Sequence, residues 1–212
     1  RVVIDNWPTG DDGESFVEHV ELANNPENEA DGTRMVPFSG RLWIEQDDFR
    51  AEPPPKYYRL TPGREVRLRG AYFVTCTGFE TDDSGDVTRV LVTYDPETRG
   101  GNAPDGRRVK STMHWVSTAH AVDARVALYE RLFSAEVPGE RTGEVLDDLD
   151  PDSRELLTDC KVEPALADTP PGEVVQFERL GYFARDPESP MLFHRTVGLR
   201  DEWANIQKRK NA

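Results

Sequence analysis

Residues 56–72, KYYRLTPGREVRLRGAY, carry five cations and three tyrosines in a chain that is otherwise acidic. Arg67 and Arg69 alternate with Val66 and Leu68, so a strand here presents both guanidinium groups on one face and buries the apolar side chains. The Pro-Gly pair at 62–63 is a turn signal, and it predicts a hairpin in which residues 56–60 pair with residues 65–72.

This basic stretch is suited to single-stranded RNA. Cations attract a phosphate backbone, and tyrosine rings and guanidinium planes offer surfaces on which unpaired bases stack. The alternative is a solvated strand edge that its charges keep soluble. The residues of the stretch alone leave both interpretations open.

The overall charge limits which nucleic-acid functions are possible. The 212 residues carry a formal net charge of −14, which argues against nonspecific coating of nucleic acid, although a local basic groove remains compatible with it. No apolar run approaches the length of a membrane span, and the chain begins at Arg1, so we expect a soluble internal or C-terminal piece of a protein. The only cysteines, Cys76 and Cys160, predict free, buried thiols in a reducing cytoplasm.

Short apolar runs separated by Pro- and Gly-rich turns predict an all-β protein built from closed β-barrels. Residues 95–109 hold three glycines and two prolines and form the best boundary, giving domains at 1–108 and 109–205 and a basic tail at 206–212. We expect a helical turn at 45–49, a short helix at 144–157, and strands at 2–4, 16–22, 34–44 with a kink at Pro37, 72–80, 87–94, 122–133, 160–164, 173–180, 182–185 and 191–199.

Catalytic and metal-binding signatures are missing from the sequence. The acidic runs at 82–86 and 148–152 lack full calcium-loop spacing and indicate turns and caps. His114 and His120 do not have zinc-ligand spacing with either cysteine, and His114 is expected to be a hydrogen-bonded core residue. Neither a nucleophile elbow nor a phosphate-binding Gly-rich loop is present, so we expect no catalytic residue and no metal site.

Three segments closely resemble the C-terminal half of bacterial glutaminyl-tRNA synthetases: RMVPFSGRLWI at 34–44, VKSTMHWVSTAHA at 109–121 and HRTVGLRDEW at 194–203. Shorter matches fall in order between them, so the likeness covers about residues 1–205. The resemblance implies two tandem β-barrels of the ribosomal protein L25-like type, with exchanged N-terminal strands and a few short helices. It also implies the anticodon-binding part of a cytoplasmic, monomeric glutamine-tRNA ligase whose separate catalytic domain uses ATP.

The resemblance further implies which residues contact the anticodon loop of glutamine tRNA. Arg59 is expected to meet the third anticodon base, with Lys56 and Tyr58 next to the middle and third bases. Arg67 and Arg69 are expected to contact the wobble base and nearby phosphates. Gln176 and Arg179, from the other barrel, are expected to contact the middle base and its backbone.

Some positions depart from the family pattern. Lys56 and Tyr58 stand where glutamine and lysine are familiar, and Gly70 replaces an asparagine. We therefore expect contacts to the first and middle bases that are weaker, or rearranged with Tyr58 stacking. Three alternatives stay open: a related glutamyl-tRNA synthetase, a stand-alone RNA-binding β-barrel, and a protein-interaction module with acidic faces.

Overall fold

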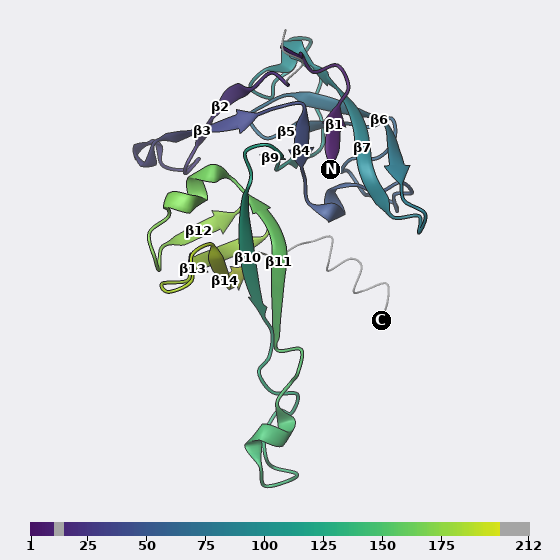
Figure 1. Ribbon diagram of the computed structural model, residues 1–212. Coiled ribbons are helices and arrows are strands. Elements are labelled where there is room, and N and C mark those ends of the chain that lie inside the picture. The colour runs from purple at the N-terminus through teal and green to yellow at the C-terminus, as the bar shows by residue number, and fades with distance from the viewer. Residues whose placement is uncertain (11–14, 200–212) are drawn as a thin grey trace. The chain divides into compact units, whose positions relative to one another are not determined.

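The computed structural model describes residues 1–10 and 15–199, which form two compact units. The basic tail expected at 206–212 lies outside the described residues. Unit 1 comprises Arg1–Ala121 together with Glu163–Ala165, and unit 2 comprises Val122–Val162 and the chain from Leu166 onward. The units divide at residue 121, whereas we placed the boundary within 95–109. The reason is that residues 112–117 form strands in the sheet of unit 1. Figure 1 shows that both units are built from curled sheets, which confirms the all-β class.

Within its described residues, unit 1 has nine strands and three short 3-10 turns. The turns are η1 (Glu29–Asp31), η2 (Gln46–Asp48) and η3 (Pro96–Thr98), and η2 confirms the predicted helical turn. The strands are β1 (Val2–Ile4), β2 (Glu18–Ala23), β3 (Thr33–Phe38), β4 (Arg41–Trp43), β5 (Glu65–Leu68), β6 (Phe73–Thr81), β7 (Val87–Asp95), β8 (Thr112–Met113) and β9 (Val116–Ser117).

Seven of these strands form one sheet in the order β8-β5-β6-β7-β1-β4-β9, and β2 pairs with β3 in a second sheet. The predicted pairing of residues 56–60 with residues 65–72 is wrong. The antiparallel partner of β5 is β6, and its other edge is taken by β8 in parallel. Residues 56–60 instead lie in the loop that follows η2, and Leu60 forms an isolated β-bridge with Phe49.

The predicted kink at Pro37 is also wrong. Pro37 lies inside β3 opposite His19, and the break before β4 falls at Ser39 and Gly40 instead. A proline fits there because β3 has only β2 as a ladder partner, so the missing N–H leaves no second strand unpaired.

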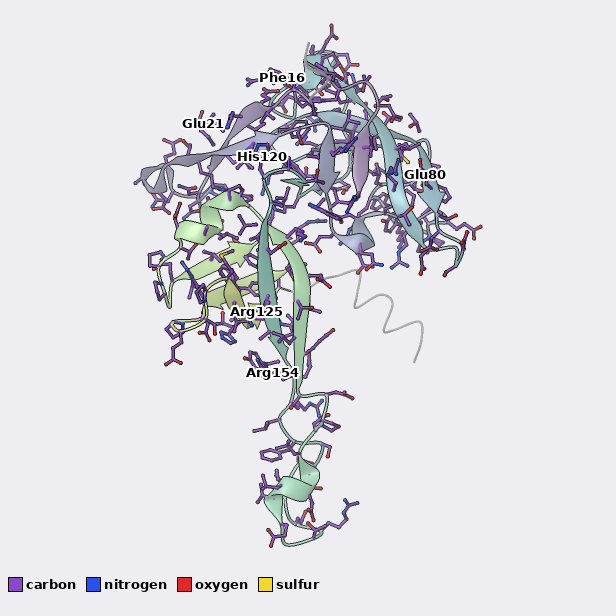
Figure 2. The ribbon with its side chains drawn as sticks, viewed as in Figure 1. Phe16, Glu21, Glu80, His120, Arg125 and Arg154 are labelled. Carbon is purple, nitrogen blue, oxygen red and sulfur yellow. The ribbon has the colours of Figure 1, made fainter. Side chains whose placement is uncertain are left out.

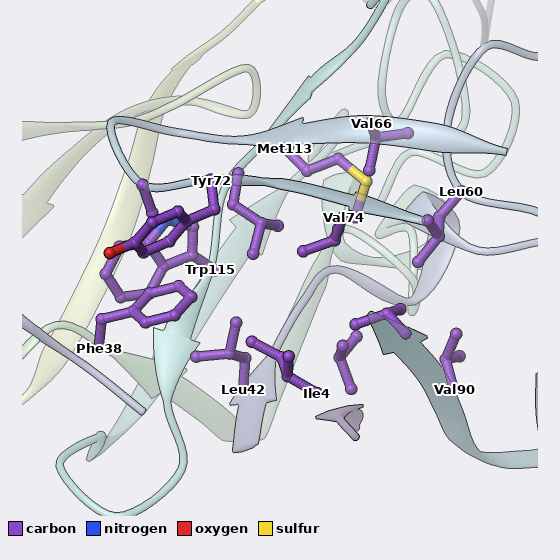
Figure 3. Packing of buried hydrophobic residues seen from close by; sticks show 14 of the residues in the cluster. Ile4, Phe38, Leu42, Leu60, Val66, Tyr72, Val74, Val90, Met113 and Trp115 are labelled. Atoms are coloured by element: carbon purple, nitrogen blue, oxygen red, sulfur yellow. The ribbon is translucent and has the colours of Figure 1, made fainter. Parts of the chain in front are cut away.

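The core of unit 1 follows the alternation in the sequence. Val66 and Leu68 of β5 are fully buried, and they belong to one hydrophobic cluster with residues of β1, β4, β6, β7 and β8 (Figure 3). The ring of Phe38 meets that of Trp115 edge-on, with centroids 4.7 Å apart. Each such buried apolar side chain stabilises the fold by about 1.5–3 kcal/mol. The sheet that includes residues 65–68 of the basic stretch is therefore backed by a well-packed hydrophobic core.

One buried ion pair fixes the segment at 163–165 within unit 1. Glu163 is 6% exposed, and its carboxylate accepts two hydrogen bonds from Arg34, at 2.6 and 3.0 Å. His114 approaches it, with Nε2 3.7 Å from Oε1. The predicted core histidine is therefore half-buried beside a carboxylate, and among the described residues no group of His, Cys, Asp and Glu could hold a metal ion.

Unit 2 is a five-stranded sheet in the order β11-β10-β14-β13-β12. Its small core includes Val126, Phe183 and Phe193, with Phe177 packed against them. The turns are η4 (Val145–Asp148) and η5 (Pro164–Asp168), and the strands are β10 (Val122–Tyr129), β11 (Arg154–Val162), β12 (Val174–Phe177), β13 (Gly181–Arg185) and β14 (Leu192–Gly198).

Strands β10 and β11 lie side by side, and a long excursion at 130–153 joins them (Figure 1). The strand predicted at 122–133 is confirmed over Val122–Tyr129 as β10, but it ends at Tyr129 and not at residue 133. Of the helix predicted at 144–157, only the short turn η4 is helical. The strand β11 begins at Arg154, which pairs with Tyr129 of β10. Figure 2 shows Arg154 at the base of the excursion and Arg125 on β10.

Cys76 and Cys160, both in the described part of the chain, are thiols. Cys76 is buried, and burial raises the pKa of its thiol. Cys160 is only half-buried, so the prediction of burial is wrong for this residue. Within residues 1–10 and 15–199, no helix has the length and apolar character needed to cross a membrane.

Candidate RNA-binding site

Two buried side chains hold the loop at 56–60 and turn its other residues outward. Tyr57 is 3% exposed and donates its hydroxyl to the Asp47 carbonyl at 2.9 Å, and burial raises its pKa. The Leu60 amide donates to the Asp48 carbonyl at 3.0 Å. Between these anchors Tyr58 remains 47% exposed, so its ring is available to a ligand.

Arg59 is oriented by a buried carboxylate. Its Nε lies 3.4 Å from Oδ1 of Asp48, whose side chain is completely buried, and Nη1 lies 3.4 Å from the Asp47 carbonyl oxygen. A charged partner of this kind restricts the guanidinium to one orientation. The Arg59 side chain keeps 22% of its surface exposed, so part of the fork can still meet a ligand.

Lys56 and Arg179 share an uncommon backbone conformation. Both have φ of 66°, and the only other non-glycine residue with positive φ in the described part of the chain is Met191. This conformation costs about 1–3 kcal/mol and persists where the surrounding structure enforces it, often at functional sites. Two predicted site residues therefore lie at strained positions.

Arg67 projects from β5 beside a glycine loop. Its stem packs against Gly101, where an added Cβ would approach Arg67 Cδ to 3.0 Å. Its guanidinium carbon lies 5.3 Å from the centre of the Phe73 ring. Within the described residues Arg67 forms no ion pair, so its charge is not compensated by a carboxylate.

Arg107 also lies near Phe73, with its guanidinium carbon 5.4 Å from the ring centre, but it differs from Arg67. Its guanidinium pairs with Glu65 at 3.0 Å, with Asp105 at 2.8 Å, and with Asp95. These hydrogen bonds raise the pKa of Arg107 and hold the pKa of Asp95 below its usual range. The charge of Arg107 is thus compensated by carboxylates of the protein itself.

Arg69 lies just beyond β5, and its backbone is fixed on two sides. Its amide donates to the Met113 carbonyl at 2.9 Å, and its carbonyl accepts from Trp115 Nε1 at 2.9 Å. Gly70 follows with φ of 62°, a conformation that asparagine also tolerates. A Cβ there would meet Leu22 Cδ2 at 2.2 Å, so Leu22 fills the space that the family's asparagine would need.

Unit 2 carries the other two predicted site residues. Gln176 is exposed on β12, paired with Tyr182 of β13, while its neighbours Val175 and Phe177 pack on the core. The strand predicted at 173–180 ends at Phe177, and Arg179 lies in the turn that leads to β13. Gln176 and Arg179 are thus placed at the same end of one hairpin.

Sequence reasoning missed Asp48, Arg107 and Lys110. Lys110 Nζ lies 4.7 Å from the centre of the Tyr58 ring, and the next residue, Ser111, accepts the Arg67 amide at 3.0 Å. This connects the 56–60 loop with β5 through a third segment. These contacts depend on the parallel pairing of β5 with β8, which cannot be predicted from the local sequence of either strand.

The sequence matches two profiles, both described as tRNA synthetases class I (E and Q), anti-codon binding domain, over residues 1–95 and 112–186. It is 51% identical to a glutamine–tRNA ligase of Nitrobacter winogradskyi over 97% of this chain and 36% of the relative. It is 49% identical to the ligase of Rhodopirellula baltica over 98% of this chain and 34% of the relative. The chain thus spans about a third of the length of these relatives.

Proposed function

Because the chain belongs to the family of class I (E and Q) tRNA synthetase anticodon-binding domains, we propose that it binds the anticodon loop of glutamine tRNA within a glutamine–tRNA ligase. The relatives favour this function over a glutamyl-tRNA synthetase and over a stand-alone RNA-binding protein, since they are glutamine–tRNA ligases that match almost the whole chain.

The arrangement of charge carries the proposal. In a chain with a net charge of −14, Arg107 is matched by three carboxylates, whereas Arg67 beside it has no carboxylate partner among the described residues. An uncompensated guanidinium in such a chain suits an external anion, and RNA phosphate is one. The acidic remainder repels RNA elsewhere, so binding is confined to this surface.

In the proposed mode the anticodon bases are unstacked and recognised separately. Arg59, held by Asp48, donates to the edge of the third base. Tyr58 supplies a ring on which a base stacks. Arg67 and Arg69 bind the wobble base and the phosphates next to it.

Unit 2 supplies the remaining contacts. The Gln176 amide can donate and accept at once, which suits the Watson–Crick edge of the middle base. Arg179 binds the backbone at that nucleotide. Both units thus contact one anticodon loop.

Catalysis belongs to other parts of the proposed ligase. The chain has no phosphate-binding Gly-rich loop, so we assign ATP and the chemistry of aminoacylation to segments outside it. We further propose that the ligase acts as a cytoplasmic monomer.

Aminoacylation by the complete ligase tests the proposal. Arg59→Ala is expected to reduce the preference for glutamine tRNA over tRNA with a changed third anticodon base by about 1–3 kcal/mol, roughly 5- to 150-fold in kcat/KM. Equal losses of kcat/KM for both tRNAs would make Arg59 a phosphate contact that carries no base recognition.

A further inference from the structure

The exposed ring of Tyr58 carries the ammonium group of Lys110 on one face, with Nζ 4.7 Å from the ring centroid. Lys110 lies outside the residues that the family resemblance assigns to RNA. On the basis of the function proposed above, we propose that Tyr58 and Lys110 form a subsite for one unpaired nucleotide. The ring stacks on the base, and the ammonium binds a phosphate of the same strand.

The fold brings these two side chains together from both sides. Tyr58 is presented by a loop whose neighbours Tyr57 and Leu60 are buried. Lys110 directly precedes β8, which pairs in parallel with β5, and the Arg67 amide donates to Ser111. Because both segments are held by backbone hydrogen bonds or buried side chains, the fold itself places Lys110 next to Tyr58.

The charge of Lys110 is available to a ligand. Within the described residues it forms no ion pair, whereas Arg107, three positions earlier, meets three carboxylates. A π face attracts the ammonium without accepting conventional hydrogen bonds from its three N–H donors. Those donors can therefore turn to phosphate oxygens without breaking an ion pair.

The other face of the Tyr58 ring determines the kind of ligand. A cation on one face draws π electrons toward itself, which leaves the opposite face better suited to an electron-rich base. Stacking of this kind accepts every base, because each has a π face. The subsite thus contributes affinity for unpaired nucleotides and leaves base discrimination to the other proposed contacts, Arg59 and Gln176 among them.

Equilibrium binding of a fluorescent anticodon stem-loop RNA to the complete ligase tests the subsite. Lys110→Met removes the charge and keeps the stem, and we expect about fivefold weaker binding and a log–log salt slope shallower by about 0.7. The weakening is the same factor for RNA with a changed third anticodon base. Lys110→Arg restores most of the affinity. Tyr58→Ala weakens binding about tenfold, and Tyr58→Phe, which keeps the ring, weakens it less.

Arg89→Met is the matched control, because it removes one exposed cation of unit 1 that pairs with Glu80 on the neighbouring strand. If Lys110→Met matches this control while Arg59→Ala still loses anticodon discrimination, the subsite is wrong and the proposed function stands. If the unmodified ligase binds matched and changed anticodons equally, the proposed function itself is wrong. Thermal unfolding of each variant separates loss of binding from loss of fold.

Discussion

At the scale of single residues, the alternation of Arg67 with Val66 and Leu68 was predictable because a strand sends successive side chains to opposite faces. The sequence could not show that Arg59 is held by Asp48 or that Arg107 is neutralised, since these pairings join residues that are distant in sequence or separated by loops. The chemistry of the candidate site depends on such pairings. Residue types alone identified the cations but not which of them are available.

Replacing Arg67 and Arg107 separately distinguishes an available cation from a structural one. Arg67→Met is expected to weaken tRNA binding by about 1–3 kcal/mol and to leave thermal unfolding nearly unchanged. Arg107→Met leaves three carboxylates facing one another, so it lowers the midpoint of thermal unfolding. Fluorescence binding and calorimetry measure the two effects, and a clear loss of stability in Arg67→Met would contradict the assignment.

A hydrogen-bonded chain in unit 2 joins Asp186, His194 and Tyr129. His194 Nε2 lies 2.7 Å from Asp186 Oδ2, and His194 Nδ1 lies 2.7 Å from the Tyr129 hydroxyl. An ionised carboxylate only accepts, so Nε2 of His194 donates to Asp186. The bond from His194 lowers the pKa of Asp186 to about 2.

Because the folded-state pKa of Asp186 lies below its unfolded value, ionised Asp186 stabilises the fold above about pH 4, and this stabilisation is lost as the pH falls toward about 2. Asp186→Asn should therefore lower the free energy of unfolding near neutral pH and have little effect near pH 2. Urea titrations at both pH values measure this. An equal loss at the two pH values would show that the charge of Asp186 is not responsible.

At the scale of elements, long strands with clear alternation, such as β6, β7 and β10, were predicted correctly from sequence. The errors arose where partners come from far along the chain. The 56–60 loop has strand-like residues but follows η2, and β8 and β9 join a sheet whose other strands lie before residue 96. Local patterns specify which face of a strand is buried, while the partner strand depends on the whole chain.

Gly181 tests the pairing of β13 with β14. Its φ is 158°, and an added Cβ would lie 2.3 Å from the Val197 carbonyl oxygen, which cannot move without breaking the ladder. We expect Gly181→Ala to destabilise the protein by about 3 kcal/mol. Gly198, its partner in the pairing, has open space around a built Cβ, so Gly198→Ala is the control. Urea midpoints measure both, and equal small effects would contradict the described register.

At the scale of the whole molecule, an acidic chain displays a limited set of cations to RNA. Six cations belong to the proposed contacts: Lys56, Arg59, Arg67, Arg69, Lys110 and Arg179. If each neutralises one phosphate of single-stranded RNA, the slope of log affinity against log salt concentration is no steeper than about −4.2. Titrations of anticodon stem-loop RNA at several salt concentrations measure the slope, and a slope near zero would exclude electrostatic binding of RNA.

The central claim is that residues from both units contact one anticodon loop. Photo-crosslinking measures this directly, using glutamine tRNA with thiouridine at the middle anticodon position and mass spectrometry of the attached ligase peptides. We predict crosslinks to peptides from residues 54–70 and from residues 173–182, both lost when unlabelled glutamine tRNA competes. Crosslinks confined to one unit, or unchanged by that competitor, would contradict the claim.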